Sequence, residues 1–292
     1  MISYINRFSS PMLGYELSSM KERFLLAGLE SSSLDAELIF AFVLGIRRSK
    51  IYAFPERLIS PEEMALIKKL SQRRENHEPI AYILKEKEFW STKFSLHENV
   101  FIPRPETELL VELALKNLNK HNSSIVFDIG CGSGAIGISI ALQLIDCKVF
   151  ASDISKDATV CSIQNASVNL LKNFSVVQTF LMTGFVEKNF VDLIVSNPPY
   201  IATDEIQNLV PEVVNYEPRL ALDGGKNGML HLCAIIKESA SYLVPQGTLL
   251  LEMDPHQVGS CIKEINISGK YGVPNVHKDL AGLDRVIEVK RN

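Results

Sequence analysis

From residue 125 onward, short apolar runs alternate with helical patterns along the chain. Alternation of this kind is typical of a largely parallel sheet that helices cover on both faces, because parallel neighbours need a crossover between them. We expect strands at 125–129, 148–152, 176–180, 192–196, 247–252 and 285–289, and helices at 135–144, 158–171 and 231–243. The predicted fold class of this part of the chain is therefore α/β.

The first 80 residues carry helical patterns instead, with no catalytic constellation among them. A helix start signal stands at Ser60-Pro61-Glu62-Glu63, where the serine suits the N-cap, the proline the first turn and a glutamate the capping box. Aromatic residues among threonine, serine and lysine then indicate two short strands in a hairpin-like linker. We expect three segments: a helical domain at 1–80 that positions a partner, a linker at 81–104 and a catalytic domain at 105–292.

Two consecutive prolines end the predicted strand at 192–196. Pro198 and Pro199 cannot donate ladder hydrogen bonds, so the strand stops at Asn197, which the following proline favours in an extended conformation. Tyr200 completes a stiff loop at the carboxyl end of a strand. In open α/β sheets, ligands bind at that edge.

This loop is suited to holding a planar NH2 group. The Asn197 side-chain oxygen and the Pro198 carbonyl each accept one hydrogen in this interpretation, and the Tyr200 ring packs against the flat face. Accepting both hydrogens would help a poor nitrogen nucleophile attack an electrophilic methyl group. The alternative is a proline-terminated strand followed by an ordinary surface loop.

A glycine-rich loop follows the predicted strand at 125–129 and opens a helix. Gly130, Gly132 and Gly134 allow positive φ and a close approach of the backbone to a ligand. Residues 132–137 also spell GxGxxG, the dinucleotide fingerprint, but the Asp128 carboxylate would oppose a pyrophosphate and suits a cationic or amino-bearing ligand. Asp153 ends the next strand, where a carboxylate binds ribose hydroxyls or, alternatively, caps a helix.

Composition bounds the possible partners and the compartment. The net charge of -4 gives no global basic field, so we expect no stable binding of nucleic acid. Five widely spaced cysteines without a CxxC motif argue against a disulfide framework or a zinc site. The chain shows neither a long apolar segment nor a signal-peptide pattern, so we expect a cytoplasmic protein with no membrane partner.

Beyond these single features, the chain resembles the bacterial family of class I methyltransferases that modify the glutamine side-chain amide of peptide chain release factors. The resemblance covers nearly the whole chain. It is carried by residues 34–38, 78–84, 102–108 (IPRPETE), 128–134, 196–201, 216–218, 221–225 and 279–286. The NPPY loop alone is shared with adenine-N6 methyltransferases, whereas the IPRPETE segment is much more specific.

The resemblance implies a fold, a cofactor and a set of site residues. The fold is an N-terminal helical bundle, a β-hairpin linker and a Rossmann-like, seven-stranded, mostly parallel methyltransferase domain with its last strand antiparallel. The cofactor is S-adenosylmethionine, and the partner is a release factor. The residues that would hold the cofactor are Asp128, Ile129, Gly130, Cys131, Gly132, Gly134, Asp153 and Asn197. Those that would hold the substrate glutamine are Asn197, Pro198, Pro199 and Tyr200, with Asn197, Pro198 and Tyr200 catalytic.

Three positions depart from the family pattern. Lys85 and Met253 stand where the family usually has glycine, and residues 179–185 lack the acidic residue expected near the adenine. The alternatives that stay open are an adenine-N6 methyltransferase of DNA or RNA, a glutamine methyltransferase of a ribosomal protein, a nicotinamide-dependent oxidoreductase and a non-catalytic adaptor that binds S-adenosylmethionine.

Overall fold

The computed structural model describes residues 11–118, 123–186 and 189–292, and the chain divides into two compact units after Leu84. The hairpin expected as a linker belongs to the second unit, which begins at Lys85. The division of the sequence into segments 1–80, 81–104 and 105–292 stays a prediction.

The first unit consists of helices around its own apolar core. Its elements are α1 (Leu13–Leu26), α2 (Ser32–Leu44), a 3-10 turn (Arg48–Ala53), α3 (Pro61–Glu75) and α4 (Ile80–Leu84). The expected capping box is present at the start of α3, because Ser60 Oγ accepts from Glu63 N at 3.1 Å and Ser60 N donates to the Glu63 carboxylate at 2.9 Å. A buried ion pair between Arg74 Nε and Asp35 Oδ2, 2.7 Å apart, links α3 to α2.

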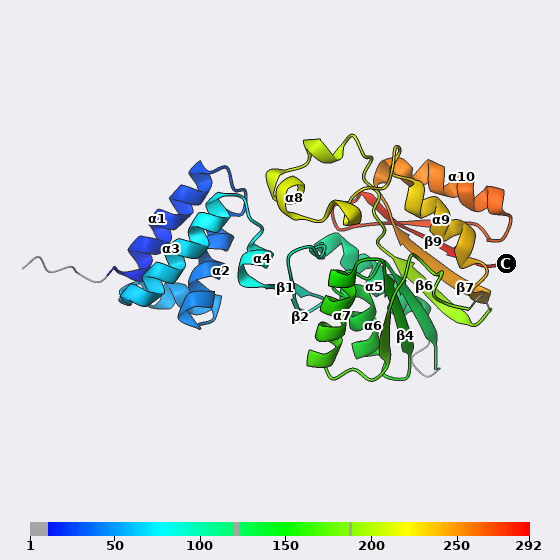
Figure 1. The fold of residues 1–292 in the computed structure, drawn as a ribbon, viewed down its shortest axis with the longest axis horizontal. Helices are drawn as coiled ribbons and strands as arrows, with labels where there is room; N and C mark the ends of the chain where they lie inside the picture. Colours follow the sequence, from blue (N-terminus) through cyan, green and yellow to red (C-terminus); the bar gives the residue numbers. More distant parts are fainter. Residues whose placement is uncertain (1–10, 119–122, 187–188) are drawn as a thin grey trace, which may run out of the picture. The chain divides into compact units, whose positions relative to one another are not determined.

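The second unit is built on a seven-stranded sheet with the strand order β5-β4-β3-β6-β7-β9-β8 (Figure 1). Its strands are β3 (Ile125–Ile129), β4 (Lys148–Asp153), β5 (Phe174–Gln178), β6 (Val191–Ser196), β7 (Leu243–Glu252), β8 (Asn275–Lys278) and β9 (Asp284–Lys290). β9 is antiparallel to both of its neighbours, while the pairs from β5 to β7 are all parallel. A separate hairpin of β1 (Glu86–Phe89) and β2 (Thr92–Ser95) precedes the sheet. The predicted α/β class and the reversed last strand are confirmed.

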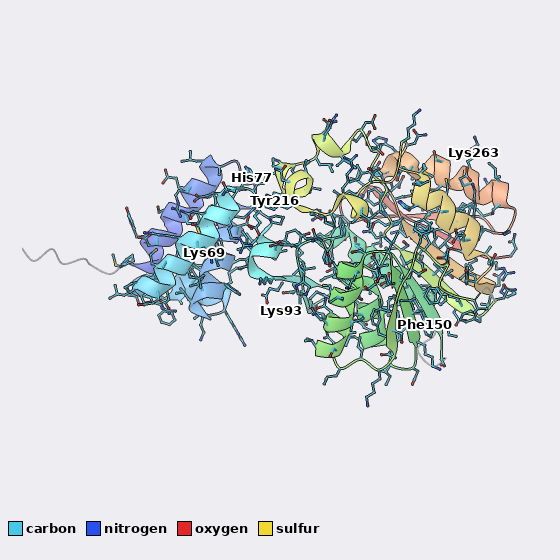
Figure 2. The ribbon with its side chains drawn as sticks, viewed as in Figure 1. Lys69, His77, Lys93, Phe150, Tyr216 and Lys263 are labelled. Carbon is cyan, nitrogen blue, oxygen red and sulfur yellow. The ribbon has the colours of Figure 1, made fainter. Side chains whose placement is uncertain are left out.

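Helices cover both faces of this sheet because successive strand residues point to opposite sides. The covering helices are α5 (Glu108–Asn117), α6 (Ala135–Gln143), α7 (Lys156–Val168), α9 (Leu230–Ser239) and α10 (Val258–Ser268), and a short further helix, α8 (Pro211–Tyr216), has no buried residue. Val126 of β3 packs in one core with residues of α5 and α6, whereas its neighbour Phe127 packs in the other with residues of α9 and α10. On the second face, Phe150 of β4, labelled in Figure 2, meets Phe127 edge on, with ring centroids 6.1 Å apart.

Several boundaries differ from the sequence-based expectation. β5 ends at Gln178, two residues before the expected end, which leaves Phe180 in the following loop. Pro105–Thr107 forms a 3-10 turn, and α5 starts directly after it at Glu108. α10 and β8 were not predicted. Lys85, which occupies a usual glycine position, has a φ of 58°, in the left-handed region that glycine adopts without strain.

Candidate active site

Three neighbouring strands bring the predicted site residues to one edge of the sheet. Ile129 of β3 pairs with Ser152 of β4 on one side and with Ser196 of β6 on the other. The Ser196 hydroxyl also donates to the Ile129 carbonyl at 2.6 Å. The residues that follow each strand end, Gly130 and Asn197, therefore lie together, and Asp153 ends β4 beside them. β3 and β6 flank the point where the strand order reverses, which is the usual ligand site of an open α/β sheet.

The glycine loop folds over the end of β4. The backbone N–H groups of Gly130 and Cys131 both donate to the Ser152 carbonyl, at 2.8 and 2.9 Å. Gly130 and Gly132 have φ values of 73° and 56°, and a Cβ at either would meet nothing within 4 Å. Gly134 differs, because a Cβ there would lie 2.5 Å from Ser162 Oγ. The first two glycines therefore leave open space for a ligand, and the third allows close packing against α7.

Asp128 lies behind this loop and not in the cavity. Its side chain is fully buried, and Oδ2 accepts from Gly137 N, in the first turn of α6, at 2.9 Å. Burial raises the pKa of the Asp128 carboxyl to about 7. The cofactor-binding role expected of Asp128 from the sequence stays a prediction, and in this position the carboxyl would act through the loop rather than from the cavity wall. Ile129 and Gly134 also lie outside the set of residues that line the cavity.

The Asp153 carboxylate joins the glycine loop to the segment that leads into α7. Its Oδ2 accepts from Gly132 N and its Oδ1 from Ser155 N, both at 2.9 Å. The alternative interpretation, in which Asp153 caps the following helix, does not hold: the N-cap of α7 is Ser155, whose hydroxyl accepts from Ala158 N at 3.3 Å. Burial raises the pKa of the Asp153 carboxyl. Each carboxylate oxygen keeps further acceptor capacity toward the cavity that Asp153 lines.

The NPPY loop is anchored on three sides. Asn197 Nδ2 donates to the Thr107 hydroxyl at 3.0 Å, and Tyr200 OH donates to Glu252 Oε1 at 3.3 Å. Gln257 Nε2 donates to the Tyr200 carbonyl at 2.8 Å. Because the Asn197 amide nitrogen is committed to Thr107, its oxygen is the group left to accept a hydrogen bond. Burial, together with the nearby Glu252 carboxylate, raises the pKa of the Tyr200 hydroxyl, which stays protonated.

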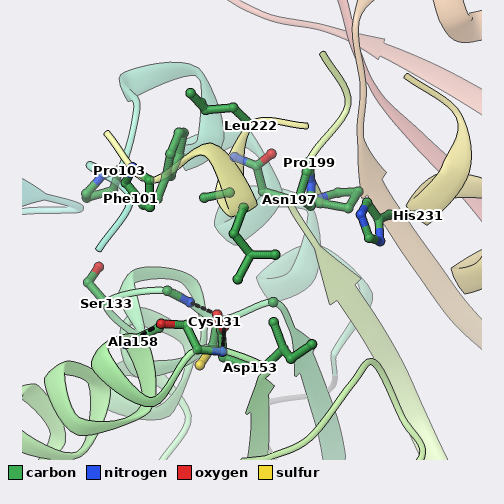
Figure 3. A pocket seen from close by; sticks show the side chains of 18 of the residues that line it. Phe101, Pro103, Cys131, Ser133, Asp153, Ala158, Asn197, Pro199, Leu222 and His231 are labelled. Carbon is green, nitrogen blue, oxygen red and sulfur yellow. Dashed lines mark hydrogen bonds between the residues drawn. The ribbon is translucent and has the colours of Figure 1, made fainter. Parts of the chain in front are cut away.

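These segments enclose a cavity of about 310 Å³. In Figure 3, Asn197 and Pro199 lie across this space from Asp153 and Ser133. Of the residues predicted from sequence, those that line it are Gly130, Cys131, Gly132, Asp153, Asn197, Pro198, Pro199 and Tyr200. Its walls are mostly apolar and include Phe101, Ile154, Phe180, Leu181 and Leu222. A small apolar chamber with a few converging polar groups is the usual form of a site for a small molecule.

One wall of the cavity carries an ion pair between a partly exposed arginine and a buried carboxylate. The Arg104 guanidinium pairs with the Glu217 carboxylate, whose side chain is 1% exposed, and lies over the Phe101 ring at 4.9 Å from its centroid. Ile102 N also donates to Glu217 Oε2 at 3.4 Å. Burial raises the pKa of the Glu217 carboxyl, and Arg104 opposes that effect. The pair ties the IPRPETE segment to the segment that follows α8.

Sequence reasoning missed several residues of the site. Thr107 and Glu252 contact NPPY side chains from distant parts of the chain, and His231 at the start of α9 lines the cavity next to Phe180, with ring centroids 6.2 Å apart. Gly228 packs against the Tyr200 carbonyl, where a Cβ would lie 2.1 Å from the oxygen. Two of these residues gave a signal in the sequence, since Thr107 lies within the IPRPETE segment and Gly228 lies close to the glycine-containing motif at 221–225.

Models of known protein families match residues in both units. The family models described as "PrmC N-terminal domain" and "Methyltransferase small domain" match residues 17–84 and 93–230. The release factor glutamine methyltransferase of Nitratidesulfovibrio vulgaris is 35% identical, with 94% of each chain covered. That of Clostridium botulinum is 38% identical, over 91% of this chain and 94% of the other.

The fold also recurs in solved structures. The 16S rRNA N2 G1207 methyltransferase of T. Thermophilus, solved with AdoMet and guanosine, has a TM-score of 0.51 and 19% identity, over 71% of this chain and 50% of that one. At this identity the likeness extends to the fold alone. Within the described ranges, every helix is too short or too polar to span a bilayer.

Proposed function

Because this chain belongs to the release factor glutamine methyltransferase family, we propose that it transfers a methyl group from S-adenosylmethionine to the side-chain amide nitrogen of a glutamine in a peptide chain release factor. The observation that carries the proposal is the orientation of Asn197. Its amide nitrogen is held by Thr107, so its oxygen is available to a substrate N–H beside the glycine loop. This is the arrangement that a planar amide needs.

The residues around the cavity fit S-adenosylmethionine. The open space above Gly130 and Gly132 suits the close approach of a ligand, and a side chain at either position would fill it. The Asp153 carboxylate at the end of β4 is placed to accept from ribose hydroxyls. Apolar side chains such as Ile154 and Leu181 offer surfaces for a flat base. When bound, this cofactor supplies an electrophilic sulfonium methyl group.

The protein's own contribution is position and hydrogen-bond acceptance. An amide nitrogen is a poor nucleophile because its lone pair is delocalised into the carbonyl. Asn197 Oδ1 and the Pro198 carbonyl accept the two N–H groups and stabilise the positive charge that develops on the nitrogen as the bond forms. Tyr200, anchored through its hydroxyl, forms the wall against which the amide packs. The proton leaves after attack, so no strong base is needed beforehand.

We assign substrate recognition to the helical residues 1–80. The match of the family model to residues 17–84 supports this division, as does the separate core of the first unit. The net charge of -4 over the whole chain provides no basic field that would attract nucleic acid, which favours a protein substrate. The compartment that contains release factors is the cytoplasm, which is where we place the chain.

A comparison of three substrate classes tests the proposal. The purified protein is incubated with methyl-labelled S-adenosylmethionine and, separately, with a release factor, a ribosomal protein and double-stranded DNA. We expect label on the release factor alone. Label on DNA would point to an adenine-N6 methyltransferase, and label on the ribosomal protein to the other glutamine methyltransferases; either result would overturn the assignment of the substrate.

A further inference from the structure

Glu252 is a buried carboxyl directly behind the NPPY loop. It is the last residue of β7, and because Ser196 of β6 pairs with Leu251, Glu252 and Asn197 follow at adjacent strand ends. The residue is 1% exposed and does not line the cavity. Its Oε2 is buried and has no hydrogen-bond partner among the described residues. A buried carboxyl with an unpaired oxygen weakens the fold, so its position calls for a functional explanation.

Two residues of the site lead to this one carboxyl. Tyr200 OH donates to Glu252 Oε1 at 3.3 Å. The Thr107 hydroxyl faces the same carboxyl, favours its ionised form, and accepts from Asn197 Nδ2 at 3.0 Å. The polar side-chain groups of Asn197 and Tyr200 are therefore both linked to Glu252. Asn197 is linked through the Thr107 hydroxyl, and Tyr200 is linked directly.

The donor and acceptor roles in this chain follow from the charge of the carboxylate. An ionised carboxylate only accepts, so the hydroxyls of Thr107 and Tyr200 both donate to Glu252. The Thr107 oxygen then has only acceptor capacity left, and the Asn197 group that faces it must be the NH2. This leaves the Asn197 oxygen toward the cavity. With a donor in place of the carboxylate, the amide of Asn197 is no longer held in one orientation.

We propose that Glu252 is a positioning residue that fixes the orientation of Asn197 through Thr107 and holds the ring of Tyr200, so that the NPPY loop presents acceptors to the substrate amide. The inference rests on the proposed methyl transfer and deepens it. Glu252 touches neither substrate nor cofactor, and its effect is exerted through Thr107 and Tyr200.

The charged groups that face Glu252 come from two segments. Arg285 of β9 favours the ionised carboxylate and is itself held by Asp279, with Arg285 Nε 3.1 Å from Asp279 Oδ2. Glu106 of the IPRPETE segment disfavours it, and burial is the largest influence, raising the pKa of Glu252 to about 7. The carboxyl therefore changes charge close to neutral pH, and the orienting effect is strongest above that value.

The test compares Glu252→Gln with the wild-type enzyme on an intact release factor. We expect kcat to fall by about 10- to 100-fold, as misorientation of a catalytic group does, while the dissociation constant of S-adenosylmethionine stays within about twofold. The wild-type kcat should rise with pH through about 7, and that rise should be absent in the variant. Glu288→Gln, on neighbouring β9 and paired with His277 at 2.6 Å, is the matched control and should behave like wild type.

A double-mutant cycle separates positioning from general damage. In an Asn197→Ala background, Glu252→Gln should lower kcat much less than it does alone, because the residue through which it acts is missing. Thr107→Val breaks the same chain without altering the carboxyl, and should reproduce the loss of kcat even if Glu252→Gln does not fold. If the wild type is active and either Glu252→Gln or Thr107→Val keeps full kcat, the positioning role alone is overturned. If the wild type is inactive, the proposed function is overturned.

Discussion

Asn197 and Thr107 form a side-chain hydrogen bond of 3.0 Å although they lie 90 residues apart in the sequence. Thr107 belongs to the IPRPETE segment at the start of α5, and Asn197 opens the NPPY loop after β6. The bond joins the NPPY loop to the IPRPETE segment, the more specific of the two motifs. It also commits the amide nitrogen of Asn197, and with it the direction of the oxygen.

Replacing Asn197 should therefore affect turnover far more than cofactor binding. Asn197→Ala removes one of two acceptors for the substrate N–H groups, and loss of one such group typically lowers kcat by about 10²- to 10³-fold. The dissociation constant of S-adenosylmethionine, measured by calorimetry, should change little. Turnover near the wild-type value would show that the acceptor role is misassigned.

Asp153 should govern cofactor affinity. Asp153→Asn removes the charge and one of the two oxygens that accept from Gly132 N, Ser155 N and the expected ribose hydroxyls. Hydrogen bonds to a charged group are worth about 1.5–3 kcal/mol, which corresponds to a roughly 10- to 100-fold weaker binding of S-adenosylmethionine. Asp157→Asn, at an exposed position in the first turn of α7, is the control. Equal affinities of both variants would contradict the assignment.

Gly228 should be required for the shape of the NPPY loop. It has a φ of 67°, and a Cβ would lie 2.1 Å from the Tyr200 carbonyl oxygen and 2.4 Å from Gln257 Nε2. Gly228→Ala must displace the loop, so we expect a lower kcat and a loss of about 1–3 kcal/mol in the free energy of unfolding. Gly259→Ala in α10, where a Cβ meets nothing within 4 Å, should instead be neutral or stabilising by up to about 1 kcal/mol. Equal behaviour of the two variants in urea unfolding and turnover would refute this.

Asp128 should make stability depend on pH. Burial raises the pKa of its carboxyl to about 7, above its unfolded value of 3.8. A group with a raised folded-state pKa contributes stability that is present below its unfolded pKa and lost as the pH rises through its folded pKa. Asp128→Asn removes this titration. The free energy of unfolding of the wild type should therefore fall relative to that of the variant as the pH rises from about 4 to about 7. A constant difference across this range would argue against the raised pKa.

The sequence predicted the framework of the site because local rules set it. Consecutive prolines must end a ladder, which located the NPPY loop, and glycines after a buried strand located the cofactor loop. The alternation of strands and helices then brought both loops to one edge. Phe180 was predicted to lie in a strand because apolar residues continue past the end of β5. The last pair of the β4–β5 ladder is Asp153 with Gln178.

What the sequence could not predict depends on contacts between distant residues. Asp128 is fully buried because it packs against α6. The residue type alone does not reveal that burial. Thr107 and Glu252 reach the NPPY loop from segments far along the chain. Thr107 lies within the IPRPETE motif, but nothing in that motif shows that it contacts Asn197, and no local pattern marks Glu252. His231 likewise reaches the cavity only through the way α9 packs on the sheet.

The central claim is that the methyl group is delivered to one glutamine side chain of a release factor. The most direct measurement compares an intact release factor with a variant in which the candidate glutamine is replaced, using methyl-labelled S-adenosylmethionine and peptide mass spectrometry to locate the label. We predict label on the native protein alone, at the side-chain nitrogen of that glutamine. Equal labelling of both proteins, or label on neither while the cofactor still binds, would contradict it.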